Sequence, residues 1–140
     1  MLHLAPSLLR RLVEAAEAAY PEEACALLVG TAGIGDIRHV ERVELSDNVA
    51  TDRLSRFEVD PGLRIGLERE LRGGARRIVG VWHSHPDGAA APSATDAALA
   101  CEPELVWLIT AVAGGEAVAT AAFAVNDHGP GFRPLALLSD

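Results

Sequence analysis

Residues 78–96 read IVGVWHSHPDGAAAPSATD, and this segment holds the clearest structural signals of the chain. Its first eight residues are mostly apolar, which predicts a strand over 78–85. On a strand, residues i and i+2 point to the same face, so His83 and His85 share one face. Pro86 cannot donate to a strand ladder and ends the strand there. The two imidazoles are therefore placed at a strand end, where they can hold one metal ion.

A third metal ligand is expected close to the histidines, because zinc in hydrolases usually takes three protein ligands and leaves a fourth position for water. Ser93 and Asp96 have the spacing of a capping box, which predicts a short helix beginning at about Ser93. Asp96 lies in the first turn of that helix and is the candidate third ligand. Two imidazoles and one carboxylate leave the metal positively charged, which lowers the pKa of a coordinated water.

A carboxylate that activates this water is expected from Glu22 or Glu23, which precede an apolar run at 24–30. Such a group can accept a proton from the attacking water and pass it to the leaving amine. From the residues alone the choice between the two glutamates stays open, and both are also compatible with solvated charges near a helix end.

Each candidate also has a purely structural interpretation. Ser93 and Asp96 alone would cap a helix, and a single histidine is more often a surface or core residue than a ligand. His3, His39 and His128 are interpreted in that way. It is the joint spacing of the candidates that favours a metal site.

Helical and strand patterns alternate along the rest of the chain. Apolar residues with helical spacing predict a helix that opens at Pro6-Ser7 and ends at Pro21. Intermixed helices and strands with an antiparallel hairpin predict an α/β fold with a mixed sheet, and the 140 residues fit a single domain over 1–140. The other predicted elements are strands at 23–30 and 37–45, a loop at 46–56, a helix opened by Pro61 with Leu63, Leu67 and Leu71 on one stripe, a hairpin of 105–113 and 117–125, and an edge strand within 132–138.

The formal charge of −8 comes from twelve arginines, no lysine and twenty acidic residues. A nucleic-acid binder needs a basic face, and Arg72 with Arg76-Arg77 is too small a cluster to provide one. The acidic balance also argues against binding to anionic membranes. The sequence contains no apolar run long enough for a signal peptide or a membrane-spanning helix. We therefore expect a cytoplasmic protein.

The two cysteines, Cys25 and Cys101, are far apart in the sequence, and each lies in an apolar stretch. With no sign of export, both are expected to be buried free thiols rather than a disulfide. Trp82 and Trp107 lie in apolar strands and are expected in the core.

The chain resembles the JAMM (MPN+) metalloproteases. His83-Ser-His85, seven further residues and Ser93-x-x-Asp96 match the family's motif. The family also has an upstream glutamate in a Pro-x-Glu-x-x-Gly-Leu-like context, and residues 21–27, PEEACAL, are similar to it. This match places the glutamate on Glu23, with Ala26 in place of the usual glycine. Asn48, Phe57 and Asp60-Pro61 resemble the family's middle segment, so the similarity covers nearly the whole chain.

The resemblance implies a single MPN domain, with a curved mixed sheet flanked by helices in an architecture like that of cytidine deaminases. It implies one Zn²⁺ per chain held by His83, His85 and Asp96, with Glu23 as general acid/base. Ser93 would help to stabilise the tetrahedral intermediate. The implied reaction is hydrolysis, by metal-activated water, of a peptide or isopeptide bond after the C-terminal tail of a ubiquitin-like protein.

Several alternatives stay open at this point. Residues 96–105 are too few for the insertion that selects linked ubiquitin chains, so the chain resembles stand-alone prokaryotic members that process ubiquitin-like sulfur-carrier proteins. The small loop at 88–92 equally suits a zinc amidase acting on a small molecule or short peptide. A non-catalytic, metal-stabilised binding module is the third alternative. The partner, the type of bond and the oligomeric state, including a homodimer, are not determined by the sequence.

Overall fold

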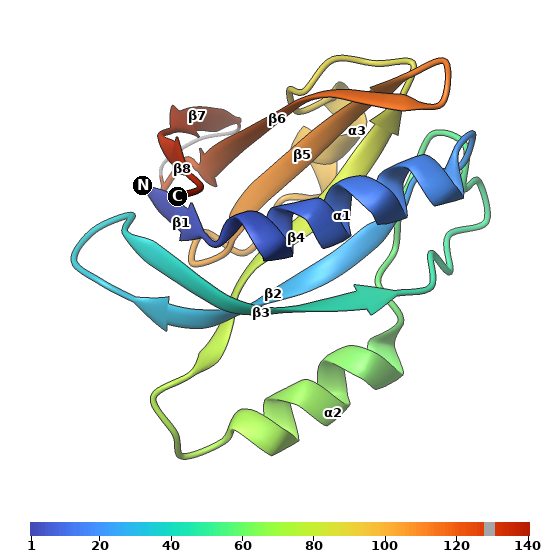
Figure 1. Cartoon of the computed structure of the whole chain (residues 1–140). Coiled ribbons are helices and arrows are strands. Elements are labelled where there is room, and N and C mark those ends of the chain that lie inside the picture. The colour runs from blue at the N-terminus through green and yellow to red at the C-terminus, as the bar shows by residue number, and fades with distance from the viewer. Residues whose placement is uncertain (128–130) are drawn as a thin grey trace.

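The computed structural model describes residues 1–127 and 131–140, so His128 lies outside the described residues. These residues form one curved, mixed eight-stranded sheet with three helices (Figure 1). The strand order is β7-β6-β5-β4-β2-β3-β1-β8. The strands are β1 Leu2–Leu4, β2 Cys25–Ala32, β3 Arg38–Ser46, β4 Arg77–Pro86, β5 Val106–Ala113, β6 Glu116–Val125, β7 Phe132–Leu135 and β8 Leu137–Leu138, and the helices are α1 Pro6–Ala19, α2 Pro61–Leu71 and α3 Ala94–Leu99.

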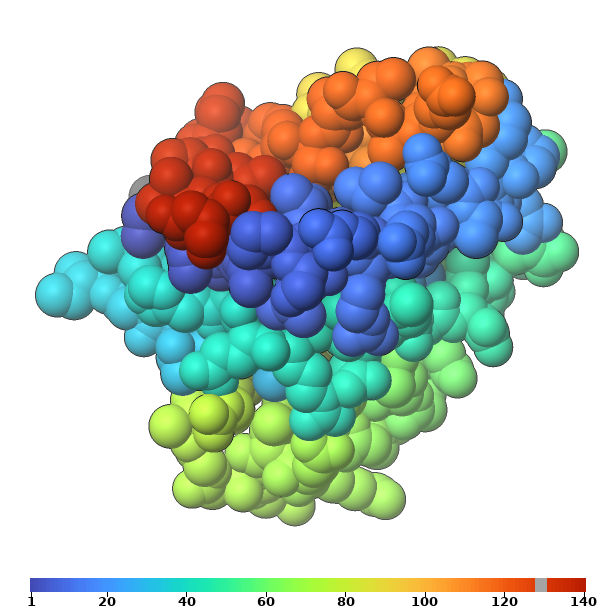
Figure 2. Space-filling model, viewed as in Figure 1, coloured from blue at the N-terminus to red at the C-terminus, as the bar shows by residue number. Residues whose placement is uncertain are grey.

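The two longer helices cover opposite faces of the sheet, as the alternation of side chains along β2 shows. Ala26 and Leu28 are buried in the core cluster that α1 joins, whereas Leu27 and Val29 are buried in the cluster that α2 joins. Figure 2 shows α1 lying across its face between β6 and β3, both of which it contacts. A strand that is buried on both faces explains the continuous apolar run in this part of the sequence.

The strand pair β4–β5 positions the histidines. These two central strands are parallel, and α3 lies in the connection between them. Because side chains alternate along β4, Trp82 points into the cluster under α1, and Val81 packs on the opposite face with Trp107. His83 and His85 are expected on the face of Val81, since they follow it at intervals of two residues. The core positions predicted for both tryptophans are confirmed, with Trp82 at 0% and Trp107 at 6% exposure.

The helix boundaries follow from the residues at their starts. Pro6 and Pro61 each occupy the first helical turn, where the missing proline N–H costs no hydrogen bond. The Asp60 side chain caps α2 by accepting a hydrogen bond from the Gly62 N–H at 3.0 Å. In α2 the predicted stripe packs on the sheet through Leu67 and its neighbours one turn away. The predicted helices and the central strands are thus present in the structure.

The C-terminal segment differs from the single edge strand predicted within 132–138. It forms β7 at one edge of the sheet and β8 at the other, and one residue, Ala136, separates them. The Ala136 carbonyl accepts a hydrogen bond from the Leu2 N–H at 2.8 Å. The sheet therefore curls until its two edges nearly meet, as Figure 1 shows for β7 and β8. Strand β1 has no periodic pattern of its own, because it contains three residues.

The expected burial of the cysteines is half correct. Cys25 is buried and Cys101 is exposed, and both are free thiols. The prediction for Cys101 is wrong because the apolar residues before it belong to the end of α3, after which the chain runs along the surface toward β5. Within the described ranges, no helix is both long and apolar enough to cross a membrane.

Candidate metal and active site

The two histidines at the end of β4 and the aspartate at the start of α3 converge on one point. The Nε2 atoms of His83 and His85 lie 3.0 Å apart. Oδ2 of Asp96 lies 3.2 Å from the first of these nitrogens and 3.0 Å from the second. Tetrahedral zinc with nitrogen and oxygen ligands at its usual bond lengths would separate its ligands by about 3.3 Å. The spacing of these three atoms therefore suits a small, tetrahedrally coordinated ion.

Asp96 is held in place by the capping box that the sequence predicted. The Ser93 Oγ accepts a hydrogen bond from the Asp96 N–H at 3.0 Å, and Asp96 Oδ2 accepts one from the Ser93 N–H at 2.9 Å. Burial opposes ionisation of this carboxyl, but its hydrogen bonds with both histidines outweigh burial and hold the pKa of Asp96 well below its usual range. Asp96 is thus an anionic candidate ligand with a fixed orientation.

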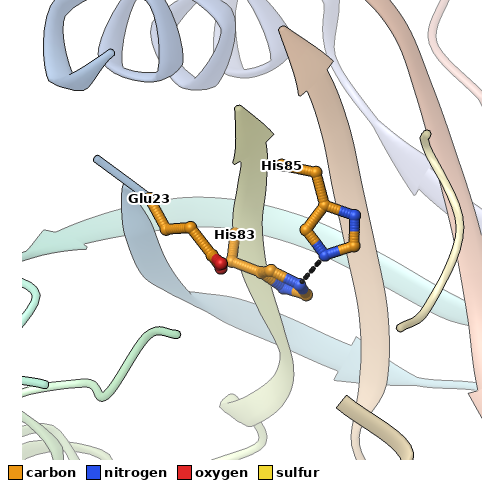
Figure 3. Close-up of side chains that lie close together, drawn as sticks. All are labelled: Glu23, His83 and His85. Carbon is orange, nitrogen blue, oxygen red and sulfur yellow. Dashed lines mark hydrogen bonds between the residues drawn. The ribbon is translucent and has the colours of Figure 1, made fainter. Parts of the chain in front are cut away.

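Glu23 lies two residues before the start of β2, and its carboxylate points toward the imidazoles (Figure 3). One ligand atom from each of Glu23, His83 and His85 lies within 4.8 Å of the others. Asp96 makes direct contact with both histidines, so it is the better third ligand, and Glu23 is left to face the open side. Its Oε1 is buried and has no hydrogen-bond partner among the residues that the structure describes.

The environment of Glu23 suits a proton acceptor. Burial raises the pKa of Glu23 to about 7, although the nearby His85 opposes this shift. A carboxyl that titrates near neutrality can both accept and release a proton at physiological pH. Glu22 differs, because its half-exposed carboxylate accepts a hydrogen bond from Arg53 Nε at 3.1 Å on the surface. The structure therefore separates the two adjacent glutamates, which the residue pattern alone did not.

The two imidazole rings are oriented by different means. His85 Nδ1 lies 2.8 Å from the Ala89 carbonyl oxygen. This contact requires a proton on Nδ1, so in the neutral ring Nε2 keeps a lone pair for a metal. His83 instead stacks on Phe57, with ring centroids 4.2 Å apart, and meets the Trp107 ring edge to face at 5.3 Å. Its Nδ1 is buried without a hydrogen-bond partner in the described part of the chain.

Ser84 is a candidate for a supporting role that the sequence pattern does not single out. Its buried Oγ accepts a hydrogen bond from the Ala24 N–H at 2.8 Å, and its own N–H donates to the Ala24 carbonyl at 3.1 Å. Ala24 follows Glu23, so Ser84 connects the segment that carries the carboxylate to the strand that carries the imidazoles. The alternation of β4 places Ser84 on the face opposite the histidines, which was the available signal for a supporting role.

The side chain of Asp87 holds the loop after β4 through contacts that the sequence does not predict. Asp87 has a positive φ of 55°, an uncommon backbone conformation that aspartate tolerates better than most residues. Its side chain accepts hydrogen bonds from the Tyr20 hydroxyl at 2.6 Å and from the Gly114 N–H at 2.9 Å. This loop begins after Pro86, the last residue of β4, and so starts two residues after His85.

Three cavities adjoin the site in the described part of the chain, and one of about 660 Å³ is lined by Glu23, Asn48 and residues of α1. One of about 410 Å³ is lined by Glu23, His85 and Ser93, together with Leu54 and Ser55 of the loop at 49–57. Another of about 310 Å³ is mainly apolar and lies beside the aromatic residues that hold His83. A molecule in the cavity of about 410 Å³ can therefore contact the Glu23 carboxylate, His85 and the Ser93 hydroxyl together.

Comparison with known proteins gives consistent matches. A sequence profile described as prokaryotic homologs of the JAB domain matches residues 5–125. Desampylase from Haloferax volcanii is 34% identical over 103 residues, which cover 74% of this chain and 72% of that protein. The solution structure of a protein from Desulfitobacterium hafniense superposes with a TM-score of 0.80 at 30% identity, covering 100% of this chain and 94% of that chain. A JAB1/MPN domain protein from Archaeoglobus fulgidus supports the fold alone, with a TM-score of 0.56 at 18% identity over 99% of this chain and 98% of that chain.

Proposed function

The chain belongs to the family of prokaryotic JAB (JAMM/MPN) domains, and we propose that it is a zinc-dependent peptidase or isopeptidase acting after the C-terminal tail of a ubiquitin-like or sulfur-carrier protein. One observation carries the proposal. Three potential ligand atoms, on His83, His85 and Asp96, lie 3.0–3.2 Å from one another beside the buried and unpartnered Oε1 of Glu23. This donor set, two imidazoles and one carboxylate, is typical of catalytic zinc sites.

The chemistry is divided between the metal and the side chains. When bound, zinc would act as a Lewis acid that lowers the pKa of a water molecule toward neutrality. Glu23 Oε1 would accept a proton from the attacking water and deliver it to the nitrogen of the leaving amine, so that the C–N bond breaks without releasing an amide anion. A pKa of about 7 lets the same carboxyl perform both transfers.

Ser93 would stabilise the charge that develops on the carbonyl oxygen during attack. Its Oγ already accepts a hydrogen bond from the Asp96 N–H, which leaves the hydroxyl proton free for another acceptor. The side chain lines the same cavity as Glu23 and His85. A donor that meets the oxyanion in a partly buried site stabilises the transition state more than the ground state.

The substrate class rests on the similarity to desampylase, whose name denotes removal of the ubiquitin-like modifier Samp. A test is to incubate the zinc-loaded protein with each small ubiquitin-like protein of its own organism, carrying a C-terminal extension, and to read the products by intact mass. We expect one cut directly after the tail of at least one of them, and none with Glu23→Gln.

A peptide with the tail sequence alone separates the alternatives. Cleavage of the free peptide as efficiently as of the whole protein would favour an amidase for small substrates. No cleavage of any protein or peptide by the zinc-loaded protein would contradict the hydrolase assignment and favour a binding module.

A further inference from the structure

The loop at 49–57 is joined to the backbone of Glu23 by one side chain, and we propose that this side chain, Asn48, is a positioning residue for the Glu23 carboxylate. The inference rests on the proposed role of Glu23 as proton acceptor. Asn48 follows β3 and precedes the loop, about 25 residues after Glu23 in the chain. It does not line the cavity that Glu23, His85 and Ser93 share, and its four hydrogen bonds go to none of the candidate ligand atoms, so it would act through other groups.

Every hydrogen-bond donor and acceptor of the Asn48 side chain has a partner. Nδ2 donates hydrogen bonds to the Glu23 carbonyl and to the Arg56 carbonyl, both at 2.9 Å. Oδ1 accepts hydrogen bonds from the Ala50 N–H and the Glu58 N–H, both at 3.0 Å. A primary amide offers two donor protons and two lone pairs, so these four bonds leave none free. One side chain thus closes the loop at both ends and joins the closed loop to Glu23.

The loop also holds Glu23 from a second point. The Glu23 N–H donates to the Arg53 carbonyl at 2.8 Å, in the middle of the loop. Both backbone polar groups of Glu23 are therefore bonded either to the loop or to the residue that closes it. Burying peptide groups without such partners would be costly, so the loop and the Glu23 backbone stabilise one arrangement together.

This backbone attachment matters because one oxygen of the Glu23 carboxylate has no hydrogen bond from the described residues to hold it. Oε1 of Glu23 has no hydrogen-bond partner within the described ranges. Its position relative to the imidazoles therefore depends on the backbone from which the side chain extends. The same loop ends at Phe57, which stacks on His83 at 4.2 Å. Loosening the loop would disturb the carboxylate first and one ligand ring second. A displacement of about 1 Å at a reacting group can cost on the order of 100-fold in rate.

Asn48→Asp is the sharpest test, because aspartate has nearly the same shape. Its carboxylate still accepts from the Ala50 and Glu58 N–H groups but cannot donate to the Glu23 and Arg56 carbonyls. With a protein substrate cleaved by wild type, we expect kcat to fall at least about 10-fold while KM changes less than about threefold. Zinc content, measured by elemental analysis, should stay at the wild-type level.

Amide hydrogen exchange gives a readout that does not depend on catalysis. In the zinc-free protein, NMR should show the Glu23 amide exchanging at least about 10-fold faster in Asn48→Asp than in wild type, because its bond to Arg53 depends on the closed loop. Asn48→Ala, which removes all four bonds, should increase exchange at Ala50 and Glu58 as well. Activity and exchange are compared at a temperature where each variant is folded.

Ser46→Ala is the matched control. Ser46 Oγ accepts from the Asp60 N–H at 2.9 Å and donates to the Asp47 carbonyl at 2.7 Å, so its loss weakens the same region without touching Glu23. It should lower the melting temperature and leave kcat within about twofold of wild type. An equal loss of kcat in Ser46→Ala, or wild-type kcat in Asn48→Asp, would overturn the positioning role. If the Glu23 amide exchanged as slowly in Asn48→Asp as in wild type, the positioning role would be overturned even if no substrate were found. A wild-type protein that cleaves nothing would overturn only the proposed function.

Discussion

The Tyr20 hydroxyl lies 2.6 Å from Asp87 Oδ2 and joins the end of α1 to the loop that follows the strand of His83 and His85. The same carboxylate accepts from Gly114 in the β5–β6 turn, so three segments meet at one exposed side chain. Both bonds favour the ionised carboxylate, with the larger effect from the Gly114 N–H, and lower the pKa of Asp87.

Replacing Asp87 should therefore destabilise this junction. Asp87→Ala loses both bonds and also leaves a residue that tolerates positive φ poorly, so we expect the free energy of unfolding to fall measurably. Asp87→Asn keeps an acceptor and tolerates this conformation, so its loss should be smaller. Urea denaturation of the zinc-free proteins measures both. Equal losses in the two variants would show that the side-chain bonds contribute little.

The metal assignment predicts about one zinc per chain in the purified protein, as expected for a three-ligand site. His85→Ala should lose most of this zinc, because it removes one of the three nitrogen and oxygen ligands. His39→Ala, in a strand away from the site, should retain it. Elemental analysis after gel filtration gives the ratio, and full occupancy in His85→Ala would contradict the ligand set.

The assignment of Glu23 rather than Glu22 predicts opposite behaviour for two neighbouring variants. Glu23→Gln keeps the side-chain shape but cannot accept the proton, so activity should fall roughly 10²- to 10⁴-fold with zinc retained. Glu22→Gln removes only a surface contact with Arg53 and should be nearly silent. Steady-state kinetics on one substrate compares them, and the reverse pattern would move the general base to Glu22.

Burial of Glu23 also predicts a pH-dependent stability of the zinc-free protein. The carboxyl has an ordinary pKa of 4.5 when unfolded and about 7 when folded, so the folded state binds more protons between these values. Its contribution to stability is complete below about pH 4.5 and is lost as the pH rises to about 7. The side chain of Glu23→Gln does not ionise, so this variant does not lose stability in this way. Its free energy of unfolding relative to wild type should therefore increase by about 3 kcal/mol from pH 4.5 to pH 8. Chemical denaturation at several pH values measures this difference, and a constant difference would mean that Glu23 ionises freely in the fold.

Ser93 is expected to serve two roles that one variant can separate. As an N-cap, Ser93→Ala should cost about 1 kcal/mol of stability. As an oxyanion donor, it should also lower kcat about 10²- to 10³-fold with little change in substrate binding. Turnover is measured where the variant is folded and loaded with zinc. Near wild-type kcat under those conditions would leave Ser93 as a helix cap alone.

The site was predictable from sequence where its geometry is local. His83 and His85 share a strand face by period two, and Asp96 follows in the first turn of a helix whose cap is visible as Ser93. Glu23 could be proposed only as one of two carboxylates until the family resemblance selected it, because nothing in the residue pattern fixes which glutamate turns inward.

The supporting contacts could not be predicted, because they depend on packing between distant segments. Asn48 meets Glu23 through a side-chain bond, and Tyr20 meets Asp87 across 67 residues. No regular sequence spacing predicts either of these contacts. The division of the C-terminal segment between two sheet edges has the same origin, since the curl of the whole sheet decides which strands come together.

The capping box at α3 links metal binding to local folding. Oδ2 of Asp96 accepts the Ser93 N–H that begins the helix and also faces both imidazoles, so one oxygen serves the helix start and the ligand set. With six residues, α3 is too short to be stable by itself. An ion that fixes Asp96 would therefore also stabilise this helix, and its binding free energy would include the ordering of α3. Zinc affinity and the order of the cavity wall at Ser93 would then rise and fall together.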